Sequence, residues 1–245
     1  KVHLNYDQFL PKNLSFFKDL KSKNDNRFET NDNNLSVIDI GANVGDTLYH
    51  LVSSNNKHKY FCIEAEKYFY SYLKKNVENL KRIEKNLNVT LINKLVGDNL
   101  SGYMKIANGT ATIADIWQTE KRAGWENITE KNEILYSETL DKIVDEYNID
   151  NIFLIKVDTD GYDHQVLLSG IKTIEKYKPI LFFEYLNYNE NFESYKNFFY
   201  KLQKIGYSKY KALNNRGDII IENCSLEDLL SQLKKYQILD LLFYN

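Results

Sequence analysis

Short apolar runs alternate with amphipathic segments from Leu35 onward, and this alternation constrains the fold more than any other feature of the sequence. The runs that we expect to be buried strands are Val37–Ile40, Tyr60–Ile63, Val89–Val96, Ile152–Val157 and Pro179–Phe183. The segments with helical spacing are Thr47–Ser53, Glu66–Leu80, one helix through Val166, Leu167, Ile171 and Ile174, and Tyr195–Ile205. Strands that alternate with helices form a parallel sheet wound by crossover helices. The sequence therefore predicts an α/β fold with a mostly parallel, doubly wound sheet.

The last part of the chain has a different pattern. Two β-strand candidates, Tyr207–Leu213 and Asp218–Glu222, flank the turn sequence Asn214–Gly217. A turn of this kind between two strands predicts an antiparallel hairpin, which we place at the edge of the sheet. Ser225 then has the character of a helix N-cap, so Ser225–Leu233 is predicted to be a helix.

Composition argues against two classes of partner. The formal net charge is -2 and the only arginines are Arg27, Arg82, Arg122 and Arg216, whereas nucleic-acid-binding proteins usually carry a basic excess. No apolar run approaches the ~20 residues of a membrane span, and Lys1–Leu10 has no apolar stretch of the signal-peptide type. Two cysteines, Cys62 and Cys224, make no disulfide framework and favour a reducing compartment, so we expect a cytoplasmic protein.

The strongest motif is the glycine-rich turn that follows the first strand. Its pattern is D-x-G-x-x-x-G, with Asp39, Gly41 and Gly45 at the fixed positions and Asn43 between the glycines. Ligands of open parallel sheets bind beyond the carboxyl ends of the strands, and glycine lets a ligand approach the backbone. The spacing differs from the dinucleotide fingerprint G-x-G-x-x-G. An acid at position 39 is unfavourable for a pyrophosphate but suits the ammonium group of S-adenosylmethionine, so we assign all four residues to cofactor binding.

A second acid follows the second strand. Glu64 ends the run Tyr60–Ile63, where a carboxylate can accept hydrogen bonds from both hydroxyls of a ribose. A solvated acid at a strand end is the alternative, and dinucleotide enzymes use the same contact. Together with the Asp39 turn we favour ribose binding. Asp98, which follows Val89–Val96, is also assigned to the cofactor site.

A third cluster of polar residues follows the fourth strand. Asp158, Asp160, Asp163 and His164 lie within seven residues, and Glu184 ends the next strand. The order of the acids does not match a calcium-binding loop. Because both strands end at the same edge of the sheet, we expect these side chains to face the cofactor cleft, while Asp160 or Asp163 caps the following helix. For Glu184, a solvated acid is an equal alternative.

These segments together resemble the FkbM family of S-adenosylmethionine-dependent methyltransferases. The resemblance rests on Asp39–Gly45, Glu64, Ile155–Gly170 and Pro179–Glu184, and it extends from about Leu35 to Tyr207. The family usually shows D-x-E-G-x-E in the third motif, where this chain has Asp160 and Asp163 in place of the glutamates. The resemblance implies a Rossmann-like class I methyltransferase fold and O-methylation of a sugar, glycan or other small-molecule hydroxyl. The rival functions are a nicotinamide-dependent oxidoreductase and a non-catalytic Rossmann-like binding module.

The third motif offers two mechanisms. In the first, His164 is the leading candidate for a general base, and we expect neighbouring acids to raise its pKa. Asp158 and Glu184 are further expected catalytic residues, and Asp158 is also expected to lie beside the cofactor. The alternative for His164 is a residue of the first helical turn that contacts nearby carboxylates. The competing mechanism is a divalent metal held by Asp158, Asp160 and Glu184, because hard cations favour clustered oxygens.

The stretch of about residues 103–136 interrupts the alternation and is predicted to be an insertion that binds the acceptor. Trp117 and Trp125, the two tryptophans of the chain, lie in it, and aromatic faces suit the mixed surface of a sugar ring. The alternative is that both tryptophans fasten a β-hairpin to the core. Asp160 is the third expected acceptor contact. We predict one domain over residues 1–245, with a covering segment at 1–34 and a Rossmann-like core at 35–245.

Overall fold

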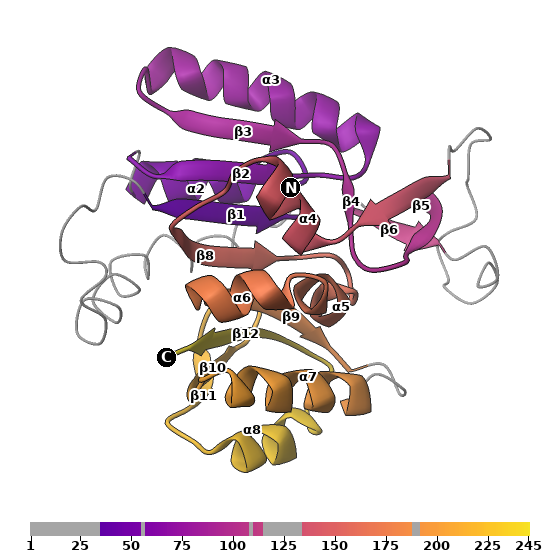
Figure 1. Ribbon diagram of the computed structural model, residues 1–245, viewed down its shortest axis with the longest axis vertical. Helices are drawn as coiled ribbons and strands as arrows, with labels where there is room; N and C mark the ends of the chain where they lie inside the picture. The colour runs from indigo at the N-terminus through magenta and orange to yellow at the C-terminus, as the bar shows by residue number, and fades with distance from the viewer. Residues whose placement is uncertain (1–34, 55–56, 108–109, 115–133, 188–191) are drawn as a thin grey trace.

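The computed structural model describes residues 35–54, 57–107, 110–114, 134–187 and 192–245 (Figure 1). The predicted covering segment 1–34 lies outside these ranges, as do Trp117 and Trp125. Within them, no helix has both the length and the apolar character needed to cross a membrane.

The main sheet has eight strands and confirms the predicted architecture. Its spatial order is β11-β10-β12-β9-β8-β1-β2-β3. The strands are β1 (Ser36–Ile40), β2 (Lys59–Ile63), β3 (Asn88–Ile92), β8 (Ile152–Val157), β9 (Ile180–Leu186), β10 (Lys209–Leu213), β11 (Ile219–Glu222) and β12 (Ile238–Tyr244). The pairs from β3 through β9 are parallel, whereas β12 is antiparallel to both β9 and β10. The β10–β11 hairpin lies at the edge, as predicted, but β12, which the sequence analysis missed, separates it from the parallel strands.

Helices cover both faces of this sheet, because its central strands are apolar on both sides. Every residue of β1 and β8 is buried. Val37 belongs to a core cluster with residues of α2 and α3, whereas the next residue, Ile38, belongs to a cluster with residues of α4 to α8. The helices are α2 (Asp46–Ser54), α3 (Lys67–Ile83), α4 (Leu140–Glu146), α5 (Asp163–Leu168), α6 (Ile171–Tyr177), α7 (Phe192–Lys204) and α8 (Leu226–Leu233).

One predicted helix is in fact two. The helix expected through Val166 and Ile174 is divided into α5 and α6 at Ser169 and Gly170. A Cβ atom at Gly170 would lie 2.5 Å from Cδ2 of Leu140, so α4 packs directly against this break. The Ser169 hydroxyl accepts a hydrogen bond from the Leu140 backbone N–H at 3.0 Å. The break therefore gives α4 its docking position.

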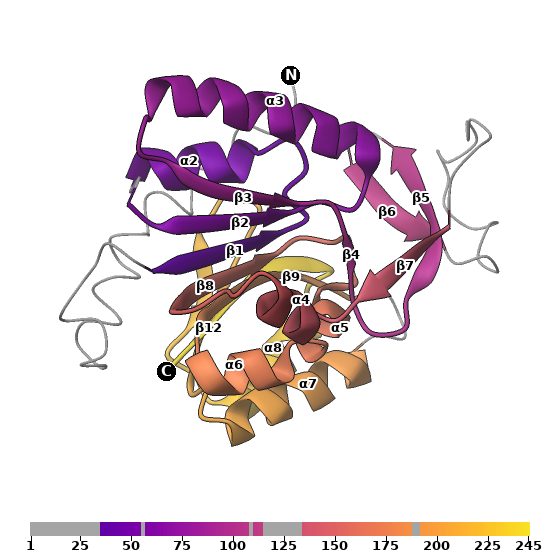
Figure 2. The same cartoon turned by 45° about the horizontal axis from the view of Figure 1, so that its top comes forward.

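A second sheet of four short strands lies at the carboxyl ends of the parallel strands (Figure 2). It contains β4 (Leu95–Val96), β5 (Ser101–Ala107), β6 (Thr110–Ala114) and β7 (Leu135–Glu138), in the order β4-β7-β5-β6. The run Val89–Val96, predicted as one strand, is thus divided between two sheets. Asn93 marks the break, since its side-chain amide donates to the backbone carbonyls of Glu64 and Ala65.

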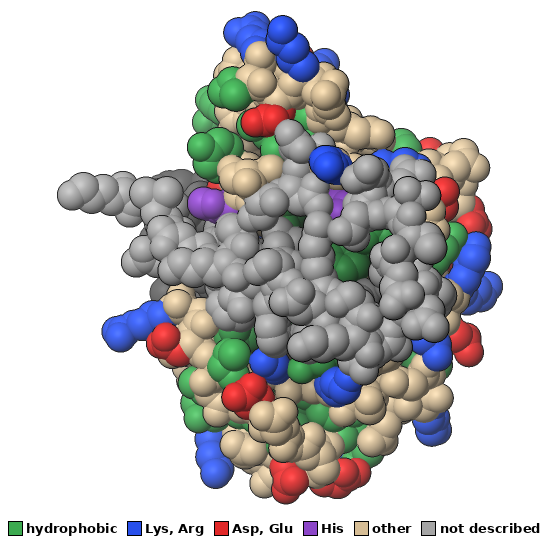
Figure 3. Space-filling model, turned by 90° about the vertical axis from the view of Figure 1, so that its left-hand side faces the viewer, with side chains coloured by type: hydrophobic (Ala, Val, Ile, Leu, Met, Phe, Trp, Pro, Cys, Tyr) green, Lys and Arg blue, Asp and Glu red, His purple; other side chains and the backbone are tan. Residues whose placement is uncertain are grey.

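The opposite end of the sheet is seen in Figure 3, where Lys and Arg side chains gather over α3. Lys81 and Arg82 are in the last turn of α3, where positive charge interacts favourably with the helix dipole.

Candidate functional site

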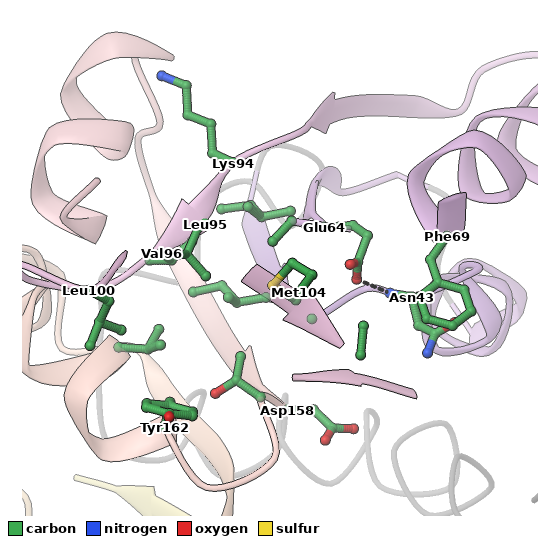
Figure 4. Close-up of a pocket in the computed structure, with 17 residues that line it drawn as sticks. Asn43, Glu64, Phe69, Lys94, Leu95, Val96, Leu100, Met104, Asp158 and Tyr162 are labelled. Atoms are coloured by element: carbon green, nitrogen blue, oxygen red, sulfur yellow. Dashed lines mark hydrogen bonds between the residues drawn. The ribbon is translucent and has the colours of Figure 1, made fainter. Parts of the chain in front are cut away.

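A pocket lies where β1, β2 and β8 end, with the small sheet along one side (Figure 4). It holds about 610 Å³ of empty space, including its open mouth. One part of its wall is apolar and includes Ile63, Phe69, Leu95, Val96, Leu100 and Met104. The other part carries Asn43, Glu64, Asp158, Thr159 and Tyr162. The pocket thus suits a ligand with one apolar part and one polar part.

The glycine-rich turn forms part of the pocket, and its glycines also have a role within the protein. Gly41 and Asn43 line the pocket, and Gly41, Asn43 and Gly45 all have positive φ angles, of 77°, 48° and 92°. A Cβ at Gly41 would lie 1.9 Å from the backbone oxygen of Asp158, and one at Gly45 would lie 2.8 Å from Cδ1 of Leu73. Both glycines therefore make room for other parts of the protein, and the approach of a ligand to them stays a prediction.

Asp39 is buried and has a charge partner within the protein. Its side chain is 2% exposed, and its Oδ1 lies 3.2 Å from Nζ of Lys156, its neighbour on the adjacent strand β8. Burial raises the pKa of Asp39, and the positive charge of Lys156 acts in the opposite direction. Asp39 is absent from the described pocket wall, so its contact with the ammonium group of a ligand stays a prediction. Lys156 Nζ also lies 3.5 Å from Oδ2 of Asp158, which does line the pocket.

Glu64 lies where the sequence places it, at the end of β2 and in the pocket wall. Its Oε2 accepts a hydrogen bond from the Asn43 backbone N–H and its Oε1 accepts one from the Glu66 backbone N–H, both at 2.8 Å. The side chain is only 6% exposed, and burial raises its pKa to about 7. The carboxylate is therefore held rigidly with its position fixed by two backbone groups.

The loop after β8 supplies the remaining polar wall. Asp158, Thr159 and Tyr162 line the pocket, whereas Asp163, the first residue of α5, is fully buried. Asp163 accepts hydrogen bonds from this loop and from β9, as described below. The prediction of a helix cap is wrong for Asp163, because the N-cap of α5 is Tyr162 and no side chain caps it.

His164 lies in the core. It is 1% exposed and its ring packs on that of Tyr195, with 4.3 Å between ring centroids. Burial lowers its pKa to about 4, so the expectation that neighbouring acids raise this pKa is wrong. Within the described part of the pocket wall, His164 is absent. Its position does not favour the role of general base.

The other expected acids are spread around the site. Asp160 is half-buried with a φ of 53°, and Glu184 on β9 has a pKa raised to about 9 by burial and, next, by the charge of Asp158. Asp98 is exposed in the bend after β4. Of the residues that line the pocket in the described ranges, none is Asp98, Asp160 or Glu184. No three His, Cys, Asp or Glu side chains among the described residues are arranged to hold a metal ion, so Asp158, Asp160 and Glu184 do not form the expected ligand set.

Several pocket residues were missed by the sequence analysis. Thr159 and Tyr162 belong to a motif that was examined only for its acids and its histidine. Phe69 comes from the first turn of α3, and Met104 and Ala111 come from the hairpin β5–β6. The signal for Met104 and Ala111 was the insertion itself, which was assigned to the acceptor and which in fact also lines the pocket of Glu64 (Figure 4).

Several solved structures are similar to this chain. A crystal structure of methyltransferase FkbM from Methylobacillus flagellatus KT is 17% identical, with a TM-score of 0.55; the similarity covers 86% of this chain and 44% of that one. Precorrin-6y C5,15-methyltransferase from Geobacter metallireducens GS-15 is 9% identical over 87% of this chain and 81% of its own, with a TM-score of 0.43. M. capricolum TrmK, in complex with S-adenosyl-homocysteine, is 16% identical over 89% of this chain and 64% of its own, with a TM-score of 0.45.

The fold is thus that of class I methyltransferases, as the first of these structures shows. This chain spans less than half the length of that protein. No curated protein matches the sequence. The family model of the methyltransferase FkbM domain matches residues 39–209, a range that contains the glycine-rich turn, Glu64 and the whole loop after β8. The resemblance seen in the sequence is confirmed, and the chain belongs to the FkbM methyltransferase domain family.

Proposed function

We propose that this chain is an S-adenosylmethionine-dependent O-methyltransferase that acts on a hydroxyl of a sugar, glycan or other small molecule, and that the pocket holds the methyl donor. The donor supplies an activated methyl group on a sulfonium. The family assignment supports the methyl transfer, and the pocket supports the donor. The nature of the acceptor rests on the family resemblance. A cytoplasmic location is part of the proposal and is supported by Cys62 and Cys224, which are both free thiols.

The observation that carries the donor assignment is the hydrogen bonding of Glu64. A carboxylate has about four acceptor sites on its two oxygens. Glu64 uses one on each oxygen for the N–H groups of Asn43 and Glu66, which leaves about two sites on a side chain that lines the pocket. Two sites suit the two hydroxyls of a ribose. Leu95, Val96 and the other apolar residues then suit the adenine.

On the acceptor side we assign Asp158 the role of proton acceptor for the hydroxyl. Its side chain is 35% exposed, it lines the pocket, and Lys156 holds one of its oxygens. Glu184 is less suited, because a pKa of about 9 keeps it protonated at neutral pH. Orientation of donor and acceptor provides much of the acceleration, and a general base typically adds about 10²–10⁴-fold. Trp117, Trp125 and Asp160 remain the proposed acceptor contacts.

Calorimetric titration with S-adenosylmethionine, S-adenosylhomocysteine and NAD tests the donor assignment. We expect the first two to bind and NAD not to bind. Glu64→Ala removes hydrogen bonds to a charged acceptor, so both S-adenosyl ligands should bind about 10- to 100-fold more weakly. Glu175→Ala, which removes an exposed acid on α6, is the control and should bind like the wild type. NAD binding with no S-adenosyl binding would replace the proposal with an oxidoreductase, and no binding at all would favour a different ligand.

A further inference from the structure

The loop that follows β8 supplies three pocket residues but has no regular structure to hold it. Asp158, Thr159 and Tyr162 line the pocket, between the end of β8 and the start of α5. Residues 160 and 161 both have positive φ angles, of 53° and 101°. A short irregular segment of this kind needs hydrogen bonds from outside its own backbone to keep one conformation.

Asp163 supplies those hydrogen bonds. Its Oδ2 accepts from the Thr159 backbone N–H at 3.3 Å, from the Thr159 hydroxyl at 3.0 Å and from the Gly161 backbone N–H at 3.3 Å. Its Oδ1 accepts from the Glu184 backbone N–H at 3.0 Å. The side chain is 0% exposed. Three of these bonds converge on Oδ2 and one reaches Oδ1, so the carboxylate is held through both of its oxygens.

The bond to Glu184 ties the loop to the neighbouring strand. The parallel pairing of β8 with β9 ends at Val157 and Phe183, so Glu184 lies one residue beyond the last pair. Beyond that point the chain of β8 turns into the loop, and the carboxylate of Asp163 accepts the bond from the Glu184 N–H. The loop is therefore attached to β9 at a point that the pairing of β8 with β9 no longer reaches.

We propose that Asp163 is a positioning residue for the donor pocket: it touches no ligand, and it holds Asp158, Thr159 and Tyr162 in the arrangement that binds the donor. The inference rests on the proposed function, because the donor defines what the arrangement is for. Asp163 differs from the acids that face the pocket because it is 0% exposed and because its four bonds join the loop to β9.

The substitution Asp163→Asn breaks this arrangement with little change in size. An amide has one oxygen in place of two, and its NH₂ group only donates. Either the Glu184 N–H or the Thr159 and Gly161 groups must then face another donor. A buried donor without an acceptor is costly, so we expect the loop to leave its conformation.

The matched control is Asp141→Asn. Asp141, on α4, also accepts backbone hydrogen bonds with its carboxylate, from the N–H groups of Thr173 at 2.8 Å and Lys172 at 3.4 Å in the first turn of α6. It is absent from the described pocket wall. Both variants should lower the thermal midpoint. Only Asp163→Asn should speed backbone hydrogen exchange in residues 158–162 and weaken S-adenosylhomocysteine binding, by about 10- to 100-fold.

Hydrogen exchange needs no ligand, so the two proposals fail separately. If the wild type binds no S-adenosyl ligand, the proposed function fails, whereas the exchange result still reports on the loop. If the wild type binds and a folded Asp163→Asn variant has unchanged affinity and unchanged exchange in 158–162, the positioning role is overturned. Equal losses of affinity in Asp163→Asn and Asp141→Asn would also overturn it, because a general loss of stability would explain both.

A milder pair of variants covers the case in which Asp163→Asn does not fold. Thr159→Val removes one hydroxyl donor to Asp163 and keeps the size of the side chain, whereas Thr159→Ser keeps the hydroxyl and removes a methyl group. We expect Thr159→Val to raise exchange in 158–162 and to weaken binding several-fold, and Thr159→Ser to retain the wild-type exchange. The reverse order would show that the methyl group matters and the bond to Asp163 does not.

Discussion

Glu64 and Asp163 are buried carboxylates at the same edge of the sheet, and each holds one corner of the pocket. The first corner is formed by Gly41, Asn43 and Glu64, and the second by Asp158, Thr159 and Tyr162. Glu64, at the end of β2, accepts two backbone N–H groups and is 6% exposed, whereas Asp163, at the start of α5, accepts four hydrogen bonds and is 0% exposed. Burial raises the pKa of each to about 7. Both carboxylates are therefore buried with raised pKa values, and they differ in position: Glu64 lines the pocket, whereas Asp163 is absent from its described wall.

The two acids therefore have different roles: one contacts the ligand and the other supports residues that do. Glu64 lines the pocket and retains acceptor sites, so the first corner can bind the ligand directly. Asp163 is 0% exposed and is absent from the described pocket wall, so its corner only supports the side chains that do face the ligand. A carboxylate that bonds to backbone groups near a pocket is thus to be judged by whether the side chain also reaches the pocket.

The largest expected effect comes from the contact that joins the two corners. Gly41 belongs to the first corner, and a Cβ there would lie 1.9 Å from the backbone oxygen of Asp158 in the second. Gly41→Ala must separate the corners and strain a residue with a φ of 77°, so we expect a loss of at least about 3 kcal/mol in unfolding free energy. For a chain of this size that is a fall of about 6 °C or more in the thermal midpoint.

Gly206→Ala is the control for Gly41→Ala. Gly206 also has a positive φ, of 110°, but its Cβ would meet only the end of the flexible Lys178 side chain, at 3.3 Å. We expect a loss of about 1–2 kcal/mol from backbone strain alone. Equal losses in the two variants, measured by denaturant unfolding, would show that the contact with Asp158 does not hold the corners together.

The sequence predicted the first corner better than the second, for a physical reason. A strand, a glycine-rich turn and Glu64 are local features, and the structure places Gly41, Asn43 and Glu64 in the pocket wall. The partners of Asp39, Asp163 and His164 depend instead on which neighbours cover them. Lys156 on β8, the Glu184 N–H on β9 and Tyr195 on α7 are distant in sequence, so a count of acids in one segment did not reveal them.

The fold shows the same difference between features that are set locally and features that are set by distant contacts. The parallel strands and their helices were predictable from alternation, because each is buried by its own apolar pattern. The division of Val89–Val96 was not, because it depends on the Asn93 side chain reaching the backbone of Glu64 and Ala65. The strand β12 was missed because its position between β9 and β10 is set by long-range antiparallel pairing.

A smaller expected effect is that only one of the two carboxylates, Glu64, releases a proton when the methyl donor binds. Hydroxyl groups that donate to Glu64 favour its ionised form and lower its pKa from about 7, so donor binding near pH 7 should release up to about half a proton. Binding should accordingly strengthen as the pH rises through 7. Asp163 touches no ligand in our proposal and should contribute no such release.

Calorimetry of S-adenosylhomocysteine binding in buffers with different ionisation enthalpies measures that proton. Glu64→Gln should abolish the release, and the Asp141→Asn control should retain it. Release that persists in Glu64→Gln would assign the proton to another group and would remove the ribose contact from Glu64.

The smallest expected effect concerns Met104, which belongs to the pocket wall but to neither corner. Met104 on β5 lines the pocket beside Leu95 and Glu64, although the insertion that carries it was predicted to bind the acceptor (Figure 4). Met104→Ala removes part of the apolar wall, and loss of apolar contact equal to about one buried methylene group costs about 1 kcal/mol. We therefore expect S-adenosylhomocysteine to bind about three- to tenfold more weakly, with the rate at saturating donor unchanged.

Tyr136→Ala is the control for Met104→Ala, because Tyr136 lies on β7 of the same small sheet and is 75% exposed. It should leave donor affinity unchanged. Met104→Ala could instead raise the KM for the acceptor while the donor binds as in the wild type. That result would show that the hairpin β5–β6 contacts the acceptor, as the sequence predicted, and that the two corners alone form the donor pocket. If donor affinity falls and the acceptor KM does not change, the hairpin β5–β6 contributes Met104 to the donor pocket, and the acceptor role of the insertion then depends on Trp117 and Trp125 alone.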